Sequence, residues 1–244
     1  MNLRNTIIYL IGIPAVGKYT VAKEIGRITG AKVVDNQLIN TPVYSVVGYD
    51  GTSTFPFPQG AGPHIETIRR AVLTVIRDFC PPDDSFVFTN VLDARAPEDK
   101  ALFRRIERLA KQRKAGFFPV WLTCDVEMLR QRKNTPERRA RLKDIDLTTI
   151  TWYLQEFEVL KTQHPNALTL DTSHCGPEIT AHRILEHVQW TNPGSSNSGS
   201  GGIQNNPEGR RRAAGSRHHN CGRYSRSSSS FPDYRSHFRG TGRS

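Results

Sequence analysis

The chain has 244 residues, which is enough for one α/β domain of ordinary size and an extension. It carries a formal net charge of +11. Its four cysteines, Cys80, Cys124, Cys175 and Cys221, lie far apart with no C-x-x-C pair, which argues against a zinc site and a disulfide framework. Because no apolar run approaches the roughly 18 residues that a membrane span needs, we expect a cytoplasmic protein.

The positive charge is concentrated near the end of the chain. From Thr191 onward, nine arginines oppose only Glu208 and Asp233, a difference of +7 that leaves +4 of the total for the preceding residues. The composition also changes there to Ser, Gly, Arg and Asn, which cannot bury enough apolar surface to offset the entropy of ordering. The sequence therefore predicts a folded domain over residues 1–190 and a disordered tail over residues 191–244.

Strand and helix patterns alternate through the predicted domain. Short β-branched and aromatic runs predict five strands: Thr6–Ile11, Lys32–Asp35, Ser85–Thr89, Phe117–Thr123 and Ala167–Leu170. Apolar residues at helical spacing predict helices over Tyr19–Thr29, Pro63–Phe79, Pro97–Lys114, Asp125–Arg132 with Asp125 as its cap, Thr148–Lys161 and Pro177–Val188. This alternation predicts an α/β fold of three layers, in which right-handed crossovers place a five-stranded parallel sheet between helices.

Two segments depart from these patterns. Residues Asn40–Pro63 contain Gly, Pro and aromatic residues without a clear period, so we expect a loop there. Pro119 lies inside the fourth predicted strand and has no N–H group to donate to a neighbouring strand. It therefore predicts either an edge strand or strand pairing that begins after the proline.

A glycine-rich segment joins the first predicted strand to the first predicted helix. It matches the pattern G-x-x-x-x-G-K, followed by Thr one place later than is usual. An apolar strand before the segment and an amphipathic helix after it are the context that a phosphate-binding P-loop requires. The predicted nucleotide-binding residues are Gly12, Ile13, Pro14, Ala15, Val16, Gly17, Lys18, Tyr19 and Thr20.

Each residue type in this segment has a physical role in phosphate binding. Gly12 and Gly17 allow a tight turn whose N–H groups point into one concavity, and the helix that follows adds its dipole. Lys18 supplies a mobile cation for the β- and γ-phosphates, and Thr20 supplies a hydroxyl near the phosphate or Mg²⁺. The alternative is a glycine-rich turn between a strand and a helix, with a lysine that is merely solvated.

With these residues, the chain resembles the shikimate kinase and nucleoside-monophosphate kinase branch of P-loop proteins over about residues 5–190. Looser relatives of this branch include gluconate kinases, antibiotic phosphotransferases and uncharacterised bacterial ATPases labelled shikimate-kinase-like. The G-x-P-x-x-G-K-x-T loop is similar to the adenylate kinase form, and the segment Val33–Asn36, an arginine-rich stretch and the segment Leu170–Ser173 follow in the expected order. The resemblance implies ATP and Mg²⁺ as cofactors, and transfer of the γ-phosphate to a small-molecule hydroxyl or phosphate acceptor.

The resemblance also assigns a catalytic role to Asp35, at the end of the second predicted strand. In such kinases the carboxylate at this place faces the acceptor hydroxyl or anchors the acceptor, because a proton acceptor must lie within hydrogen-bond reach of the attacking oxygen. The alternative is an aspartate that caps the following turn. Gln37 stands where a shikimate kinase has a second acidic residue, which argues against shikimate as the acceptor.

The basic stretch Arg130–Lys143 resembles a short lid. Phosphoryl transfer spreads negative charge over the equatorial oxygens of the moving group, and guanidinium groups that close over these oxygens stabilise the transition state. We therefore expect Arg132 and Arg138 to be catalytic residues, together with Lys18 of the P-loop. A solvated basic helix face is the alternative explanation for the same arginines.

No carboxylate ends the third predicted strand, although a Walker-B aspartate is expected at that place. Asn90 stands there instead, and Asp93 follows three residues later. Thr20 and Asp93 are accordingly the predicted metal ligands, with Asp93 reaching a hydrated Mg²⁺ ion. The alternative for Asp93 is that its side chain shapes a loop.

The aromatic residues of the predicted loop have two interpretations. The side chains of Tyr44, Tyr49, Phe55 and Phe57 either line a pocket for a planar or apolar acceptor, or plug the loop onto its own domain. His64, which follows the loop, either touches an acceptor or lies in solvent at the start of a helix. The sequence alone leaves these alternatives open.

Three functions from different classes fit these observations. The first is an ATP-dependent small-molecule kinase, and the second is an ATPase or nucleotide-dependent switch without a dedicated acceptor. The third is a nucleic-acid-associated protein, such as a polynucleotide-end kinase or an RNA binder. For the tail, weak RNA binding through Arg210–Arg212 and its aromatic neighbours, a frame-shifted C-terminus and a plain solvated linker remain open.

Overall fold

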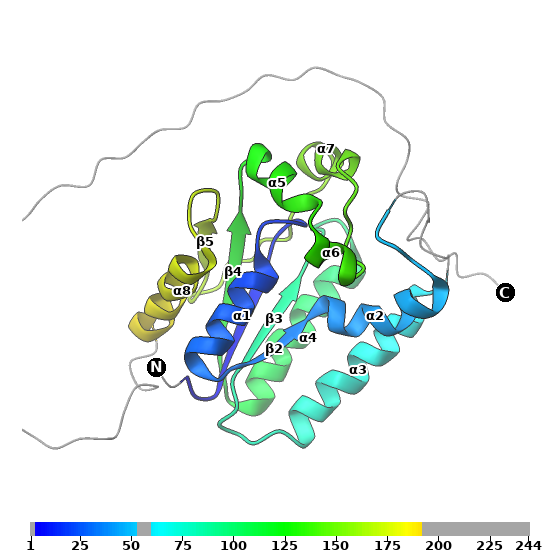
Figure 1. The fold of residues 1–244 in the computed structure, drawn as a ribbon. Helices are drawn as coiled ribbons and strands as arrows, with labels where there is room; N and C mark the ends of the chain where they lie inside the picture. Colours follow the sequence, from blue (N-terminus) through cyan, green and yellow to red (C-terminus); the bar gives the residue numbers. More distant parts are fainter. Residues whose placement is uncertain (1–2, 53–59, 192–244) are drawn as a thin grey trace, which may run out of the picture.

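A computed structural model describes residues 3–52 and 60–191, and its centre is a five-stranded parallel sheet with the strand order β2-β3-β1-β4-β5 (Figure 1). The strands are β1 (Thr6–Ile11), β2 (Lys32–Asp35), β3 (Phe86–Asn90), β4 (Gly116–Thr123) and β5 (Leu168–Asp171). All neighbouring strands pair in parallel. The predicted sheet is therefore confirmed, and each strand lies within one residue of its predicted bounds.

Helices cover both faces of this sheet. The described helices are α1 (Lys18–Thr29), α2 (Asn36–Val47), α3 (Gly62–Asp78), α4 (Pro97–Arg113), α5 (Val126–Lys133), α6 (Pro136–Ala140), α7 (Thr148–Gln155) and α8 (Pro177–Thr191). Helices α1 and α8 pack together on one face, whereas α3 and α4 pack on the other. Figure 1 shows the resulting three layers, with α5, α6 and α7 beyond the end of the sheet to which the strands point.

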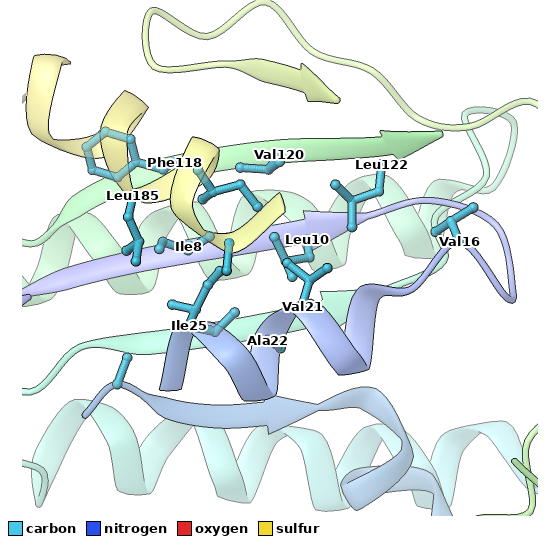
Figure 2. Packing of buried hydrophobic residues seen from close by; sticks show 14 of the residues in the cluster. Ile8, Leu10, Val16, Val21, Ala22, Ile25, Phe118, Val120, Leu122 and Leu185 are labelled. Carbon is cyan, nitrogen blue, oxygen red and sulfur yellow. The ribbon is translucent and has the colours of Figure 1, made fainter. Parts of the chain in front are cut away.

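The core on the α1 side fixes the two elements that flank the glycine-rich segment. Ile8 and Leu10 of β1 pack against Val21 and Ile25 of α1 and Leu185 of α8 (Figure 2). All five side chains are buried, and full burial of each contributes about 1.5–3 kcal/mol to folding. Because strand and helix are anchored by this core, the short connection between them is held at both ends.

The opposite face of β1 belongs to an aromatic core. Ile7 and Tyr9 point to this face, because successive side chains of a strand alternate between the two sides. The ring of Tyr9 stacks on Phe103 of α4 with the centroids 5.9 Å apart, and it meets the ring of Phe88 at 6.3 Å. Its buried hydroxyl donates to Oδ1 of Asn90 at 3.1 Å. A strand covered on both faces explains why the sequence of β1 is a continuous apolar run.

Two local predictions are decided by the hydrogen bonds. The carboxylate of Asp125 accepts a hydrogen bond from the main-chain N–H of Met128 at 2.8 Å, so the predicted cap of α5 is confirmed. Strand β4 lies between β1 and β5, so Pro119 does not mark an edge strand. Pairing with β5 begins at Val120, after the proline, whereas pairing with β1 already begins at Gly116, so the alternative prediction is confirmed only on the β5 side.

The expected loop over Asn40–Pro63 is wrong in its first part. Helix α2 extends from Asn36 to Val47 and includes Pro42 as an internal residue. An internal proline destabilises a helix by about 3 kcal/mol, which is why the sequence pattern argued against one here. The helix nevertheless buries Ile39 and packs against α3, so tertiary packing outweighs the local propensity.

The helix predicted over Thr148–Lys161 is also shorter than expected. It ends at Gln155, and the chain that follows forms an isolated antiparallel bridge between Val159 and Asp93. The carbonyl oxygen of Leu160 accepts a hydrogen bond from the indole N–H of a β4 tryptophan at 2.6 Å. The chain after Gln155 therefore packs beside the core on the α4 face as extended chain rather than as helix.

Some predictions concern residues outside the described ranges. They are the aromatic roles of Phe55 and Phe57, the disorder of the tail, and RNA binding through Arg210–Arg212. These predictions and the domain boundary at residue 190 remain predictions. Within residues 3–52 and 60–191, no helix combines the length and the apolar character that crossing a membrane requires.

One half-buried carboxyl group makes the stability of the fold depend on pH. The carboxylate of Asp99 in α4 accepts a hydrogen bond from the main-chain N–H of Asp93 at 2.7 Å. Burial raises the pKa of Asp99 to about 6, and this hydrogen bond opposes the rise. Because the folded-state pKa lies above the ordinary value, the stabilising contribution is present below about pH 4 and is lost as the pH rises through about 6.

We expect the substitution Asp99→Asn to remove this pH dependence. The wild-type protein should lose up to about 3 kcal/mol of unfolding free energy between about pH 4 and pH 7 that the variant does not lose. Urea denaturation at a series of pH values measures the difference, with the exposed Asp83→Asn as the matched control. Parallel stability profiles for Asp99→Asn and the wild type would contradict the assignment.

Candidate phosphate-binding site

The glycine-rich segment forms a tight turn at the carboxyl end of β1. A Cβ atom on Gly12 would lie 2.5 Å from the carbonyl oxygen of Leu122 in β4, so glycine is required there. Gly17 adopts the left-handed conformation (φ 94°, ψ 8°) immediately before α1. The buried Val16 anchors the turn, and its carbonyl oxygen accepts a hydrogen bond from the hydroxyl of Thr172 at 2.9 Å. The turn therefore presents the N-terminus of α1, which favours anions.

The side chain of Lys18 folds back over this turn. Its Nζ donates hydrogen bonds to the carbonyl oxygens of Gly12 at 2.6 Å and Ile13 at 2.8 Å. Burial, followed by the positive charges of Lys143 and Arg138, holds the pKa of Lys18 well below its usual value. An anion placed beside Lys18 would stabilise its charged form, because opposite charges at short range offset these effects.

Asp35 ends β2 beside the turn and is only 5% exposed. Its Oδ1 accepts a hydrogen bond from the hydroxyl of Thr89 at 2.5 Å, and its Oδ2 accepts one from the guanidinium of Arg141 at 2.7 Å. The ammonium of Lys143 lies 3.6 Å from the same Oδ2. Within the described part of the chain, the carboxylate makes no capping hydrogen bond to α2, so the capping alternative is wrong.

Arg141 and Lys143 are functional candidates beyond the predicted site residues. The guanidinium carbon of Arg141 lies 3.8 Å from the centroid of the Tyr19 ring, and Nζ of Lys143 lies 4.4 Å from it. The guanidinium also donates to the Tyr19 hydroxyl at 3.0 Å. The basic stretch thus reaches the P-loop helix through these two residues, which together with Lys18 form what we call the cation cluster.

Hydrogen bonds to main-chain carbonyl groups fix the segment that carries Arg141 and Lys143. The side-chain amide of Gln37 donates to the carbonyl oxygen of Leu142 at 3.1 Å. The N–H group of Ile145 donates to the carbonyl oxygen of Gly51 at 3.0 Å. Gln37 therefore holds the basic segment against α2.

The two predicted catalytic arginines, Arg132 and Arg138, lie in the wall of the site. The guanidinium of Arg132 donates to the carbonyl oxygen of Thr172 at 2.8 Å and to its hydroxyl at 3.2 Å. Nε of Arg138 donates to the carbonyl oxygen of Lys133 at 2.9 Å. Both side chains are half-buried, so the interpretation as a solvated helix face is wrong for them. They brace the segments around the P-loop, and Arg138 also contributes positive charge near Lys18.

The residues near the end of β3 make polar contacts with their neighbours. The side-chain amide of Asn90 donates to Oδ1 of Asn36 at 2.9 Å, which joins the ends of β2 and β3. Oδ1 of Asp93 accepts from the main-chain N–H of Arg95 at 2.8 Å and forms an ion pair with its guanidinium. The loop-shaping role of Asp93 is therefore observed, while its role as a Mg²⁺ ligand remains a prediction.

Thr20, the other predicted Mg²⁺ ligand, lies exposed in the first turn of α1. Its hydroxyl donates to the carbonyl oxygen of Gly17 at 2.8 Å, which leaves oxygen lone pairs for a cation or a water molecule. Among the described residues, no three His, Cys, Asp or Glu side chains gather into a potential metal site. This donor set fits an ion held mainly by phosphate and water, as Mg²⁺ usually is.

The two tyrosines after β2 are partly buried: Tyr44 packs against the domain core, and Tyr49 packs against Tyr44. The rings of Tyr44 and Tyr49 contact each other with the centroids 4.7 Å apart, and Tyr44 packs against the core of the α3 face. Asn40 donates a hydrogen bond to the Tyr44 hydroxyl at 3.2 Å. His64 is exposed at the start of α3. The plug interpretation is therefore confirmed for Tyr44, and the solvent interpretation is confirmed for the histidine.

No model of a known protein family matches this chain, and no curated protein matches it. Among solved structures, a gluconokinase from Sinorhizobium meliloti 1021 is similar with a TM-score of 0.51 at 12% identity, over 78% of this chain and 95% of that one. A protein assigned as a kinase from Chloroflexus aurantiacus is similar with a TM-score of 0.50 at 12% identity, over 75% and 97%. The chain therefore has the P-loop kinase fold, as its motif predicts.

Proposed function

We propose that this protein is an ATP-dependent phosphotransferase that moves the γ-phosphate to a hydroxyl or phosphate group of a small molecule. The main support is the meeting of the P-loop turn, the cation cluster and the buried carboxylate of Asp35 at one end of the sheet. The shared fold with a structure named as a gluconokinase agrees with this proposal. The acceptor is left at the level of its chemical class, because kinases of one fold use unrelated acceptors.

The electrostatics of the site support a polyanionic ligand. Burial lowers the pKa of both Lys18 and Lys143, which means that the fold holds these ammonium groups where their charge is disfavoured. A triphosphate would supply the missing negative charge to both groups and to Arg141. We infer that the β- and γ-phosphates of ATP lie between the turn at Gly12–Thr20 and the cation cluster.

Mg²⁺ would be held at this site by the hydroxyl of Thr20, with water and phosphate oxygens as its other ligands. Bound there, the ion would neutralise charge on the phosphates during transfer. Asp93 is proposed to contact it only through water, since its carboxylate is already paired with Arg95. Among the described residues, the protein itself provides few ligands, so the affinity for Mg²⁺ without nucleotide should be weak.

In the proposed reaction, an oxygen of the acceptor attacks the γ-phosphorus of ATP. The bond between that phosphorus and the oxygen bridging to the β-phosphate breaks, and ADP leaves with the electron pair. When the acceptor is a hydroxyl, its proton passes to the carboxylate of Asp35. Phosphates compete with this carboxylate for Arg141 and Lys143, so nucleotide binding would free Asp35 for the acceptor. Arg132 and Arg138 hold the surrounding segments in place.

The test is transfer of labelled phosphate into a pool of metabolites. Full-length protein is incubated with γ-labelled ATP, Mg²⁺, pooled small hydroxyl and phosphate compounds, and an RNA oligonucleotide with a free 5′ end. A labelled organic product that is absent with Lys18→Ala protein is expected. Labelled inorganic phosphate alone would favour the ATPase alternative, and labelled RNA would favour the polynucleotide-end kinase. Absence of any ATP turnover would contradict the proposal.

A further inference from the structure

Tyr19 occupies a position in the P-loop helix from which it contacts two distant cations. It follows Lys18 directly, so its ring lies at the first turn of α1. The guanidinium carbon of Arg141 lies 3.8 Å from the ring centroid and Nζ of Lys143 lies 4.4 Å from it. A third cation, Lys23, lies 5.6 Å from the same centroid. One aromatic ring therefore gathers cations from its own helix and from a segment more than a hundred residues later.

Arg141 and Lys143 are each held by two different kinds of partner. The carboxylate of Asp35 contacts both of them, at 2.7 Å and 3.6 Å, and the ring of Tyr19 contacts both as well. A carboxylate holds a cation by cancelling its charge, and it must be displaced before a phosphate can use that charge. An aromatic face holds a cation through its quadrupole and leaves the net charge intact.

We propose that Tyr19 is a positioning residue, which keeps Arg141 and Lys143 directed at the phosphate turn when a triphosphate replaces Asp35 as their counter-charge. This inference rests on the proposed function. The hydroxyl of Tyr19 accepts a hydrogen bond from Arg141 at 3.0 Å and so also orients the guanidinium. The main contribution comes from the ring face, because both cations use it and only one uses the hydroxyl.

The experiment measures binding of ATP with Mg²⁺ to full-length variants by calorimetry. Tyr19→Leu should weaken ATP binding about tenfold, whereas Tyr19→Phe, which keeps the ring, should stay within about threefold of the wild type. Thermal unfolding of each variant shows whether the fold is intact. If Tyr19→Leu does not fold, Tyr19→Met provides a second side chain without an aromatic face.

A double-mutant cycle separates positioning from a merely structural role. Each Tyr19 variant is also measured in an Arg141→Gln, Lys143→Gln background, in which residues 141 and 143 carry no positive charge for the ring to hold. The effect of Tyr19→Leu should then disappear, because the residue acts through those cations. An equal loss in both backgrounds, or wild-type affinity of Tyr19→Leu, overturns the inference while the proposed function stands. A wild-type protein that binds no ATP overturns both.

Discussion

Replacement of Lys18 by alanine is expected to lower phosphoryl transfer by about 10²–10³-fold, the usual effect of removing one preorganised donor to a developing charge. The ammonium lies on the phosphate turn, with hydrogen bonds to Gly12 and Ile13 that a phosphate oxygen would replace. The free energy of unfolding should rise or stay unchanged. Burial and neighbouring cations disfavour the charged Lys18, so its removal relieves a cost of the folded state.

The measurement combines steady-state transfer of labelled phosphate with thermal unfolding of the same preparations. Lys100→Ala is the matched control, since Lys100 is exposed on α4, which packs on the opposite face of the sheet from α1. Lys18→Ala with normal transfer would contradict the phosphate site. Lys18→Ala with lost transfer and a strongly lowered melting temperature would instead indicate that this lysine mainly supports the turn.

Asp35→Asn should separate nucleotide binding from turnover. The amide cannot accept a proton from the acceptor, so transfer to a hydroxyl should fall by about 10²–10⁴-fold. ATP should bind at least as tightly as to the wild type, because Arg141 and Lys143 no longer have a carboxylate that competes with the phosphates. The unfolding free energy should fall by about 1–3 kcal/mol, since a buried charge-assisted hydrogen bond is lost.

Calorimetry with ATP, a transfer assay and urea denaturation measure these three quantities. The exposed Asp78→Asn in α3 serves as the matched control, because Asp78 pairs only with its neighbour Arg77 among the described contacts. Normal transfer by Asp35→Asn would contradict the proton-accepting role of Asp35. Weaker ATP binding would show that Asp35 organises the cations rather than competing for them.

Most of the fold was predictable because its signals are local. The continuous apolar run Thr6–Ile11 reports burial on both faces of the sheet, and the glycine pattern after it reports a turn that tolerates no larger side chain at Gly12. These signals depend only on residues that are neighbours in the chain, so they can be recognised in a single sequence. The parallel sheet between helices followed from the alternation of strands and helices and from the preference for right-handed crossovers, whereas the order of the strands was not predicted.

The errors arose where distant contacts decide the structure. Helix α2 contains Pro42 and lacks a clear apolar period, and it is stabilised by packing against α3, which no local pattern reports. In the basic stretch, seven of the fourteen residues from Arg130 to Lys143 are Arg or Lys, so residue type alone could not rank them as candidates. Arg141 and Lys143 reach the site because contacts from Gln37 and Gly51 fix the segment that carries them.

The most direct measurement is a calorimetric titration of ATP with Mg²⁺ into the full-length protein, with Lys18→Ala as the comparison. A saturable isotherm with one site is predicted for the wild type, and it should be weakened strongly in the variant. If the wild-type protein shows no binding up to about 1 mM ATP, the upper range of ordinary nucleotide affinities, the turn at Gly12–Thr20 is not a nucleotide site.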